Sequence, residues 1–199
     1  MTGQGESSIT DLETLFRRSN AVLDGHFLLT SGLHSPVYWE KFRILENPQH
    51  VEKLCSLIAR HFADSAIDIV AGPTTGGIIL AFEVARQMNL RCIFAEKTGD
   101  RRRFQRNFKL GEDDRVLVVD DILTTGKSVR EVIDAISERG AETAGIAVLV
   151  DRSDHDLNLG FPLMSCLRSV TPTFEPGNCP LCASGVPLIK PGSSEQKIK

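Results

Sequence analysis

Apolar residues follow two different spacings along this chain, and their alternation predicts the fold. Four short, nearly continuous apolar runs are typical of strands buried on both faces of a parallel sheet: residues 67–72, 91–97, 115–121 and 143–152. Segments with helical spacing include residues 76–88 and 126–140. Strand and helix thus alternate, which predicts an α/β domain whose parallel sheet is flanked by helices through right-handed crossovers.

Further elements lie on either side of this alternating region. Residues 7–23 have the pattern of a helix that starts with a capping box from Thr10 to Glu13. Residues 25–44 predict an irregular hairpin, and Asn47 is placed to cap a second helix. We expect a single domain over 1–190 with its core at about 48–155, a small hood from about 10–45 and 156–190, and a disordered tail over 191–199.

Composition excludes several classes of function. The 199 residues suit one domain, and a net charge of −3 argues against binding nucleic acid through bulk charge. No apolar run reaches the roughly 18–20 residues of a membrane-spanning helix, and the polar N-terminus lacks the pattern of a secretion signal. The five cysteines do not suggest a disulfide framework. We therefore expect a cytoplasmic protein without a nucleic-acid or membrane partner.

The stretch Val116–Ser128, VLVVDDILTTGKS, joins an apolar strand to two carboxylates and then to a turn of small residues. Asp120 and Asp121 come at the carboxyl end of the strand, the edge where open α/β sheets bind ligands. The turn begins a helix, where free backbone N–H groups and the helix dipole bind anions. Its residues are Thr124, Thr125, Gly126, Lys127 and Ser128.

Paired acids beside an anion-binding turn fit a ribose 5-phosphate. The turn would hold the phosphate, while the carboxylates would accept hydrogen bonds from two sugar hydroxyls and stabilise positive charge at the anomeric carbon. A Walker loop is excluded because Asp121 stands where its first glycine should be, and Gly72 and Gly76 lack dinucleotide-binding spacing. The simpler alternative is a solvated Asp-Asp pair at a strand end.

The same thirteen residues resemble the phosphoribosyl pyrophosphate signature of the type I phosphoribosyltransferases. This resemblance implies the fold of that family and catalytic roles for Asp120 and Asp121. It also implies transfer of phosphoribose to a nitrogen nucleophile, with release of pyrophosphate and Mg²⁺ as cofactor. Family likeness alone further implies a homodimer in which a mobile lid is shared across the interface.

Four other segments resemble the orotate-using branch of that family, in the same chain order. In that branch the element similar to residues 27–39 lines the pyrimidine pocket with a Ser-Gly turn and aromatics. Tyr38 and Trp39 are adjacent, so on a strand they face opposite sides and do not both fit a core easily. Thr30 departs from the resemblance, since many relatives have lysine there. The implied orotate-binding residues in this region and the central turn are Ser31, Gly32, Tyr38, Trp39 and Thr124.

Two segments are candidates for contacts with pyrophosphate. Residues 71–77 follow a strand and open a helix, so the backbone around Thr74, Thr75 and Gly76 could bind a phosphate group; an ordinary turn is the alternative. Residues 94–108 resemble the family's mobile catalytic loop, and arginine suits bidentate phosphate contacts; a solvated basic loop is the alternative. Its candidate residues are Lys97, Arg101, Arg102, Arg103 and Arg106.

The fourth segment ends at Arg152, directly after an apolar run. The resemblance implies that Arg152 pairs with the carboxylate of orotate, a group that uracil and purine bases lack. A surface arginine is the alternative. Taken together, the segments predict conversion of orotate and phosphoribosyl pyrophosphate to orotidine 5′-monophosphate and pyrophosphate. The remaining alternatives are a phosphoribosyltransferase for another base and a non-catalytic regulator that senses phosphoribosyl pyrophosphate.

Cys179 and Cys182 have the spacing of a zinc knuckle. A structural zinc site normally needs four ligands, and this sequence offers Cys166 and His155 as partners without motif spacing. We therefore favour a compact turn packed on the hood over a metal site. No other residues are predicted to ligate a metal directly.

Overall fold

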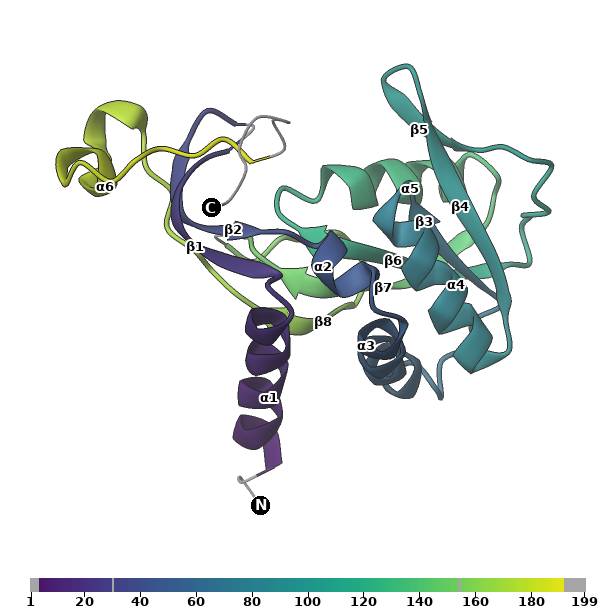
Figure 1. The fold of residues 1–199 in the computed structure, drawn as a ribbon. Coiled ribbons are helices and arrows are strands. Elements are labelled where there is room, and N and C mark those ends of the chain that lie inside the picture. The colour runs from purple at the N-terminus through teal and green to yellow at the C-terminus, as the bar shows by residue number, and fades with distance from the viewer. Residues whose placement is uncertain (1–3, 30, 154, 192–199) are drawn as a thin grey trace.

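Six strands form one sheet in the order β5-β4-β3-β6-β7-β8 (Figure 1). The structure is a computed structural model that describes residues 4–29, 31–153 and 155–191. All neighbouring pairs are parallel except β5, which pairs antiparallel with β4 at one edge. The strands are β3 (Ile69–Pro73), β4 (Arg91–Thr98), β5 (Arg101–Phe104), β6 (Arg115–Leu123), β7 (Glu142–Asp151) and β8 (Leu163–Arg168).

The two faces of this sheet carry separate apolar clusters, which explains why the strands are almost wholly apolar. On one face Val70 and Leu117 pack with α1 (Gln4–Arg18), α3 (Pro48–His61) and α4 (Gly76–Met88). On the other face Ile69 and Val118 pack with α5 (Lys127–Ser137). Alternate residues of each strand therefore enter different clusters, and the predicted parallel sheet between two helical layers is confirmed.

The helices follow the sequence pattern except at the N-terminus. Asn47 caps α3, since its side chain accepts hydrogen bonds from the backbone N–H groups of Gln49 and His50. In contrast, α1 begins at Gln4, so Thr10 and Glu13 lie inside the helix and the predicted capping box is wrong. In the described part of the chain, no helix is long and apolar enough to cross a membrane.

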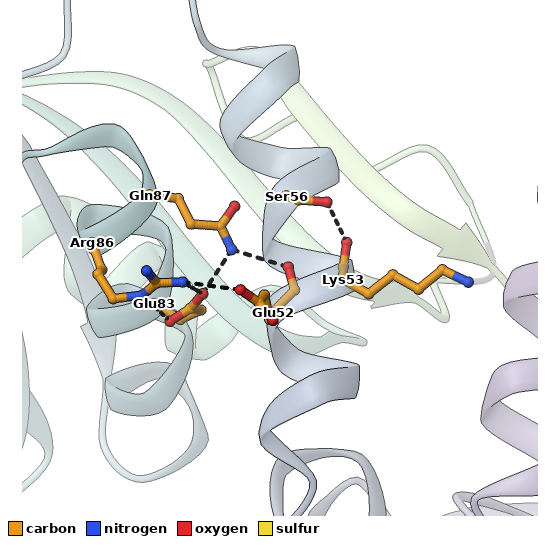
Figure 2. A network of polar contacts seen from close by, with 6 residues as sticks. All are labelled: Glu52, Lys53, Ser56, Glu83, Arg86 and Gln87. Carbon is orange, nitrogen blue, oxygen red and sulfur yellow. Dashed lines mark hydrogen bonds and ion pairs between the residues drawn. The ribbon is translucent and has the colours of Figure 1, made fainter.

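A polar network ties α3 to α4 (Figure 2). Arg86 donates hydrogen bonds to Glu83 at 2.7 and 2.8 Å and to Glu52 at 3.4 Å. Gln87 bridges the same helices, donating to the backbone carbonyl of Glu52 at 3.0 Å and to Glu83 at 2.7 Å. The Arg86 guanidinium lowers the pKa of Glu83. Because Arg86 and Glu52 are more than half exposed, we expect the network to contribute only modestly to the stability of the α3–α4 contact.

The hood is a second layer of structure beside the sheet, built from both ends of the chain. Strands β1 (Val22–Leu28) and β2 (His34–Trp39) form an antiparallel hairpin with the short helix α2 (Phe42–Leu45) after it. The C-terminal segment, with η1 (Pro176–Asn178) and α6 (Pro180–Ala183), lies against the hairpin on the left of Figure 1.

Two features of the architecture differ from the sequence analysis. Residues 163–168 were expected in the hood, yet they form β8 and extend the main sheet next to β7. Residues 101–104 were expected in a loop, yet they form β5, so β4 and β5 make a ribbon that projects from the sheet (Figure 1). Of the tail expected over 191–199, residues 192–199 lie outside the described residues.

Candidate active site

The acid pair lies in β6, near the middle of the sheet. Asp120 is 6% exposed and Asp121 3% exposed, and each carboxylate accepts a hydrogen bond from the backbone N–H of the next residue, at 2.8 and 2.7 Å. Burial and then the charge of Asp121 raise the pKa of Asp120 to about 7. The alternative of a solvated pair is therefore excluded, because two carboxylates are held out of water at a strand end.

Two features that are distant in sequence meet Asp121. The ammonium of Lys41, which follows β2, lies 3.0 Å from Oδ1 and 2.8 Å from Oδ2 of this carboxylate. Gly76 opens α4 so close to it that an added Cβ would lie 1.9 Å from Oδ2. Lys41 was missed in the sequence analysis, since no local pattern indicates a partner 80 residues away.

The predicted phosphate turn leads directly from β6 into α5. Gly126 caps α5 with a φ of 75°, a conformation that favours glycine, and its hydrogen faces Leu159. Among the described residues, none accepts a hydrogen bond from the backbone N–H groups of residues 125–128. Thr124, Thr125 and Lys127 are exposed, and Ser128 is half-buried. The turn therefore offers free donors at a helix start, which is the chemistry of an anion site.

A second helix start lies beside the first, after β3. Gly72 and Gly77 approach so closely that a Cβ on Gly72 would lie 2.2 Å from the Gly77 carbonyl oxygen, and the peptide bond between Thr74 and Thr75 is cis. Within the described ranges, no group accepts a hydrogen bond from the backbone N–H groups of residues 75–77. Two unpaired helix starts thus flank the acid pair, on adjacent strands of the sheet.

One arginine of the predicted lid reaches this second loop. The guanidinium of Arg102, on β5, donates to the backbone oxygen of Thr74 at 3.3 Å and to its hydroxyl at 3.1 Å. Its Nε lies 3.2 Å from Glu131 of α5. The other bases have other surroundings: Arg106 pairs with Glu96, Arg101 lies 3.7 Å from Glu138, and Lys97 and Arg103 are exposed.

Arg152 stands at the end of β7, next to the end of β6. Its backbone N–H donates to Leu123 at 2.8 Å, and Asp151 fixes the following turn by accepting from the N–H and hydroxyl of Ser153. Burial lowers the pKa of Arg152, and Tyr38 is the phenol near it. Its buried Nε donates to no described residue. A half-buried guanidinium with a free donor suits an anionic ligand.

The hairpin residues expected in the pocket separate into three groups. Tyr38 is half-buried, and burial raises its pKa. Trp39 is 6% exposed and packs edge-on against Phe16, so it belongs to the core and we leave it out of the site. Ser31 and Gly32 form an exposed turn with no described contact to the acid pair. Thr30 lies outside the described residues.

The cysteine pair has partners that differ from those considered from sequence. Cys166 is buried elsewhere, with its thiol 3.7 Å from the backbone oxygen of Leu54. Cys179 and Cys182 instead meet His26 and His34 of the hairpin. The two histidines were missed because they lie about 150 residues from the cysteines in sequence.

Comparison with known proteins agrees with this geometry. Residues 42–171 match the model of the phosphoribosyl transferase domain family. The chain is 46% identical, over 92% of its length and 96% of the relative's, to an orotate phosphoribosyltransferase of Caldicellulosiruptor bescii. It is 42% identical, over 91% of its length and 95% of the relative's, to the protein of the same name from Desulforamulus reducens.

Solved structures show the same architecture. The orotate phosphoribosyltransferase of Aeropyrum pernix superposes with a TM-score of 0.69 at 26% identity, covering 79% of this chain and 93% of that one. An adenine phosphoribosyltransferase of Rhodothermus marinus superposes with a TM-score of 0.63 at 20% identity, covering 80% and 99%, and this likeness concerns the fold alone. The fold is therefore shared by enzymes named for different bases.

Proposed function

The chain belongs to the phosphoribosyltransferase family, a family of transferase enzymes, and we propose on this basis that it is an orotate phosphoribosyltransferase. In the proposed reaction, the bond from the anomeric carbon of phosphoribosyl pyrophosphate to its pyrophosphate oxygen breaks. A bond forms from that carbon to a ring nitrogen of orotate, which loses its proton. The products are orotidine 5′-monophosphate and pyrophosphate.

The donor's sugar and its 5-phosphate would bind along β6 and the turn after it. The free N–H groups of residues 125–128 and the dipole of α5 suit the phosphate. Asp120 and Asp121 would accept hydrogen bonds from the ribose hydroxyls and stabilise the positive charge that develops on the ring. Lys41 would have to share or release Asp121 when the sugar binds, since it occupies both carboxylate oxygens in the ligand-free protein.

The departing pyrophosphate would lie at the second helix start. Free N–H groups of residues 75–77 and the guanidinium of Arg102 beside Thr74 supply donors there. The site also suits Mg²⁺, because its carboxylates are hard oxygen donors and Asp121 already holds the cation Lys41. Asp120 and Asp121 are the residues that would hold such an ion, and the ion would neutralise charge on the leaving pyrophosphate.

Specificity for orotate depends on one observation, the half-buried Arg152 with its free Nε. A desolvated guanidinium is costly unless an anion pairs with it, and orotate carries a carboxylate that other nucleobases lack. Tyr38, from the hairpin, stands on the same side and would flank the base. We assign the exposed turn of Ser31 and Gly32 to the outer edge of this pocket.

We further propose a homodimer that works in the cytoplasm. Its support is an exposed apolar group on neighbouring elements, namely Phe42 of α2 with Ile79 and Phe82 of α4. Phe82 is 62% exposed, which is unusual for a large apolar side chain on a helix that also forms the site. Exposed Lys97 and Arg103, on the ribbon, would then be free to act in the partner's site. All five cysteines are free thiols, as suits a reducing compartment.

The test is an absorbance assay of orotate consumption with the donor and Mg²⁺. We expect turnover with orotate and none with uracil, adenine or hypoxanthine, which lack the carboxylate. Turnover with another base alone would mean that Arg152 has a different role. Binding of the donor without turnover of any base would indicate a sensing protein instead of an enzyme.

A further inference from the structure

Four side chains from three separate segments converge inside the hood. They are two imidazoles from the hairpin and two thiols from the C-terminal segment, hereafter the His/Cys cluster: His26, His34, Cys179 and Cys182. Each offers one ligand atom, and all four atoms lie within 4.8 Å of one another. This cluster lies in the hood (Figure 1) and shares no residue with the proposed active site.

The spacing of the four atoms is close to that of a tetrahedral metal site. Zinc bonds of about 2.0–2.1 Å to nitrogen and about 2.3 Å to sulfur separate neighbouring ligand atoms by about 3.3–3.8 Å. Here His34 Nδ1 lies 3.4 Å from Cys182 Sγ, and His26 Nε2 lies 3.5 Å from Cys179 Sγ and 3.8 Å from Cys182 Sγ. The two nitrogens are closer, at 2.9 Å. A small expansion would fit a cation at the centre.

His26 is held in the tautomer that a metal needs. Its Nδ1 lies 2.8 Å from the backbone oxygen of Val186, which can only accept a hydrogen bond, so Nδ1 carries the proton. The lone pair of Nε2 is then directed into the cluster. Backbone carbonyls fix metal-binding imidazoles in the same way in zinc proteins generally.

Backbone hydrogen bonds also hold the cysteine-bearing segment against the hairpin that carries the histidines. On one side of the pair Phe174 exchanges two backbone hydrogen bonds with His34, at 2.8 and 2.9 Å. On the other side Ile189 donates to the oxygen of His26 at 2.8 Å and accepts from Leu28 at 2.9 Å. The segment that carries both thiols is therefore registered on the two strands that carry the imidazoles.

Apolar packing does not account for the order of this segment. Between residues 171 and 190, all of which the structure describes, Cys179 is the only buried residue, and it joins neither apolar cluster of the domain. Val186, Leu188 and Ile189 are each more than a third exposed. The imidazoles hydrogen-bond to each other at 2.9 Å, and His26 to the Val186 carbonyl at 2.8 Å, whereas their contacts to the two thiols are weak hydrogen bonds. A segment of this kind commonly depends on a metal or a disulfide for its stability.

We propose that the His/Cys cluster is a structural zinc site that fastens the C-terminal segment to the β1–β2 hairpin. Two thiolates and two imidazoles in a tetrahedron select zinc over magnesium or calcium, which prefer oxygen. Four protein ligands close the coordination shell, so the ion is structural and leaves no position for a substrate. The exposed Cys182 gives the ion a path of entry, and each thiol loses its proton on binding.

The first test measures zinc in protein that carries no polyhistidine tag. We expect one zinc ion per chain after dialysis against metal-free buffer. The variant Cys182→Ser should lose most of that zinc, while Cys92→Ser, a half-buried cysteine of β4 outside the cluster, should keep it. Zinc-free wild type, unchanged zinc in Cys182→Ser, or a Cys179–Cys182 disulfide in freshly purified protein would each overturn the proposal.

A second test avoids variants that fail to fold. Wild-type protein is stripped with a chelator and reloaded with Co²⁺, whose tetrahedral complexes with thiolates have strong visible and near-ultraviolet absorption. We expect those bands, with restored slow amide exchange over residues 174–189 and unchanged exchange in α5. Absence of the bands, or exchange over residues 174–189 that is indifferent to metal, would contradict the site. Neither readout depends on which base the enzyme uses.

Discussion

The strand-end site and the hood achieve order by different means. Asp120 and Asp121 are carried by β6, whose preceding residues Val118 and Val119 are fully buried between two apolar clusters. In the hood the C-terminal segment has almost no apolar core, and its one buried residue is Cys179. In one region apolar packing positions the chemical groups, and in the other backbone hydrogen bonds and the His/Cys cluster connect the segment to the hairpin.

This difference predicts how each region responds to substitution. At the strand end, replacing a charged group should abolish chemistry while the sheet remains intact, because apolar packing on both faces of β6 stabilises the sheet. In the hood, replacing a ligand atom should release the segment while the acid pair remains in place. Substitutions in each region can therefore test whether chemistry and stability are separate.

The substitution Asp121→Asn should have the largest effect on activity. It removes the charge that the ribose site uses but keeps the shape of the side chain, and Lys41 is exposed enough to be solvated when it loses its partner. We expect kcat/KM for the donor to fall about 10²–10³-fold, with the thermal midpoint within a few degrees of wild type. Steady-state kinetics and calorimetry measure both. A large loss of thermal stability would mean that the acid pair is structural, whereas the exposed Asp113→Asn should change neither quantity.

Arg152→Ala tests the boundary between the two regions, since Arg152 extends from the sheet and Tyr38 comes from the hood. Loss of a charge-assisted contact should raise KM for orotate about 10–100-fold, while KM for the donor changes less than about twofold. Arg152→Lys should be intermediate, because lysine keeps the charge but cannot bind a carboxylate bidentately. Equal changes in both Michaelis constants would mean that Arg152 does not bind the carboxylate of orotate.

The strand-end site could be predicted because its signals are local. One continuous stretch contains the strand, the acids and the turn, so hydrophobic pattern and helix-start chemistry suffice to place them. Asn47 and the bounds of α4 follow for the same reason. The capping box at Thr10 failed because the helix continues toward the N-terminus, beyond a motif that is only four residues long.

The remaining features depend on pairing between distant segments. Residues 101–104 form β5 because β4 offers an open edge, although three consecutive arginines do not resemble a strand. Lys41 meets Asp121, and the histidines meet the cysteines, only once the hairpin is placed against the sheet and the C-terminal segment. The sequence feature that could have indicated the cluster is a pair of histidines eight positions apart in the predicted hairpin. This pair suggests a metal site only when it is considered together with the Cys-x-x-Cys far along the chain.

Arg102 on the ribbon and Arg106 just after it give a matched pair with a smaller expected effect. Arg102→Ala removes the guanidinium beside Thr74 and should lower kcat about tenfold, because one charge-assisted contact to pyrophosphate is lost. Arg106→Ala removes an exposed ion pair with Glu96 and should change kcat less than about twofold. Stopped-flow and steady-state assays of both variants measure this. Equal losses would mean that the ribbon acts as a whole, through its conformation.

Asp120 should also make the stability of the ligand-free protein depend on pH, an effect on folding and not on activity. Its pKa is raised to about 7 from an ordinary value of 3.8, so between these values the folded state binds more protons than the unfolded state. Stability must then fall as pH rises through this window, by at most about 1.4 kcal/mol per pH unit. Asp120→Asn removes this pH dependence. The stability of the variant relative to wild type should therefore increase between pH 5 and pH 7, and the difference should become constant above the pKa of Asp120 in the folded state. Thermal midpoints of both proteins across this range measure the difference, and titrating groups that do not interact with Asp120 cancel because both proteins contain them. Parallel curves would show that Asp120 stays ionised in the fold, and the sheet would then stabilise a buried carboxylate more effectively than its surroundings indicate.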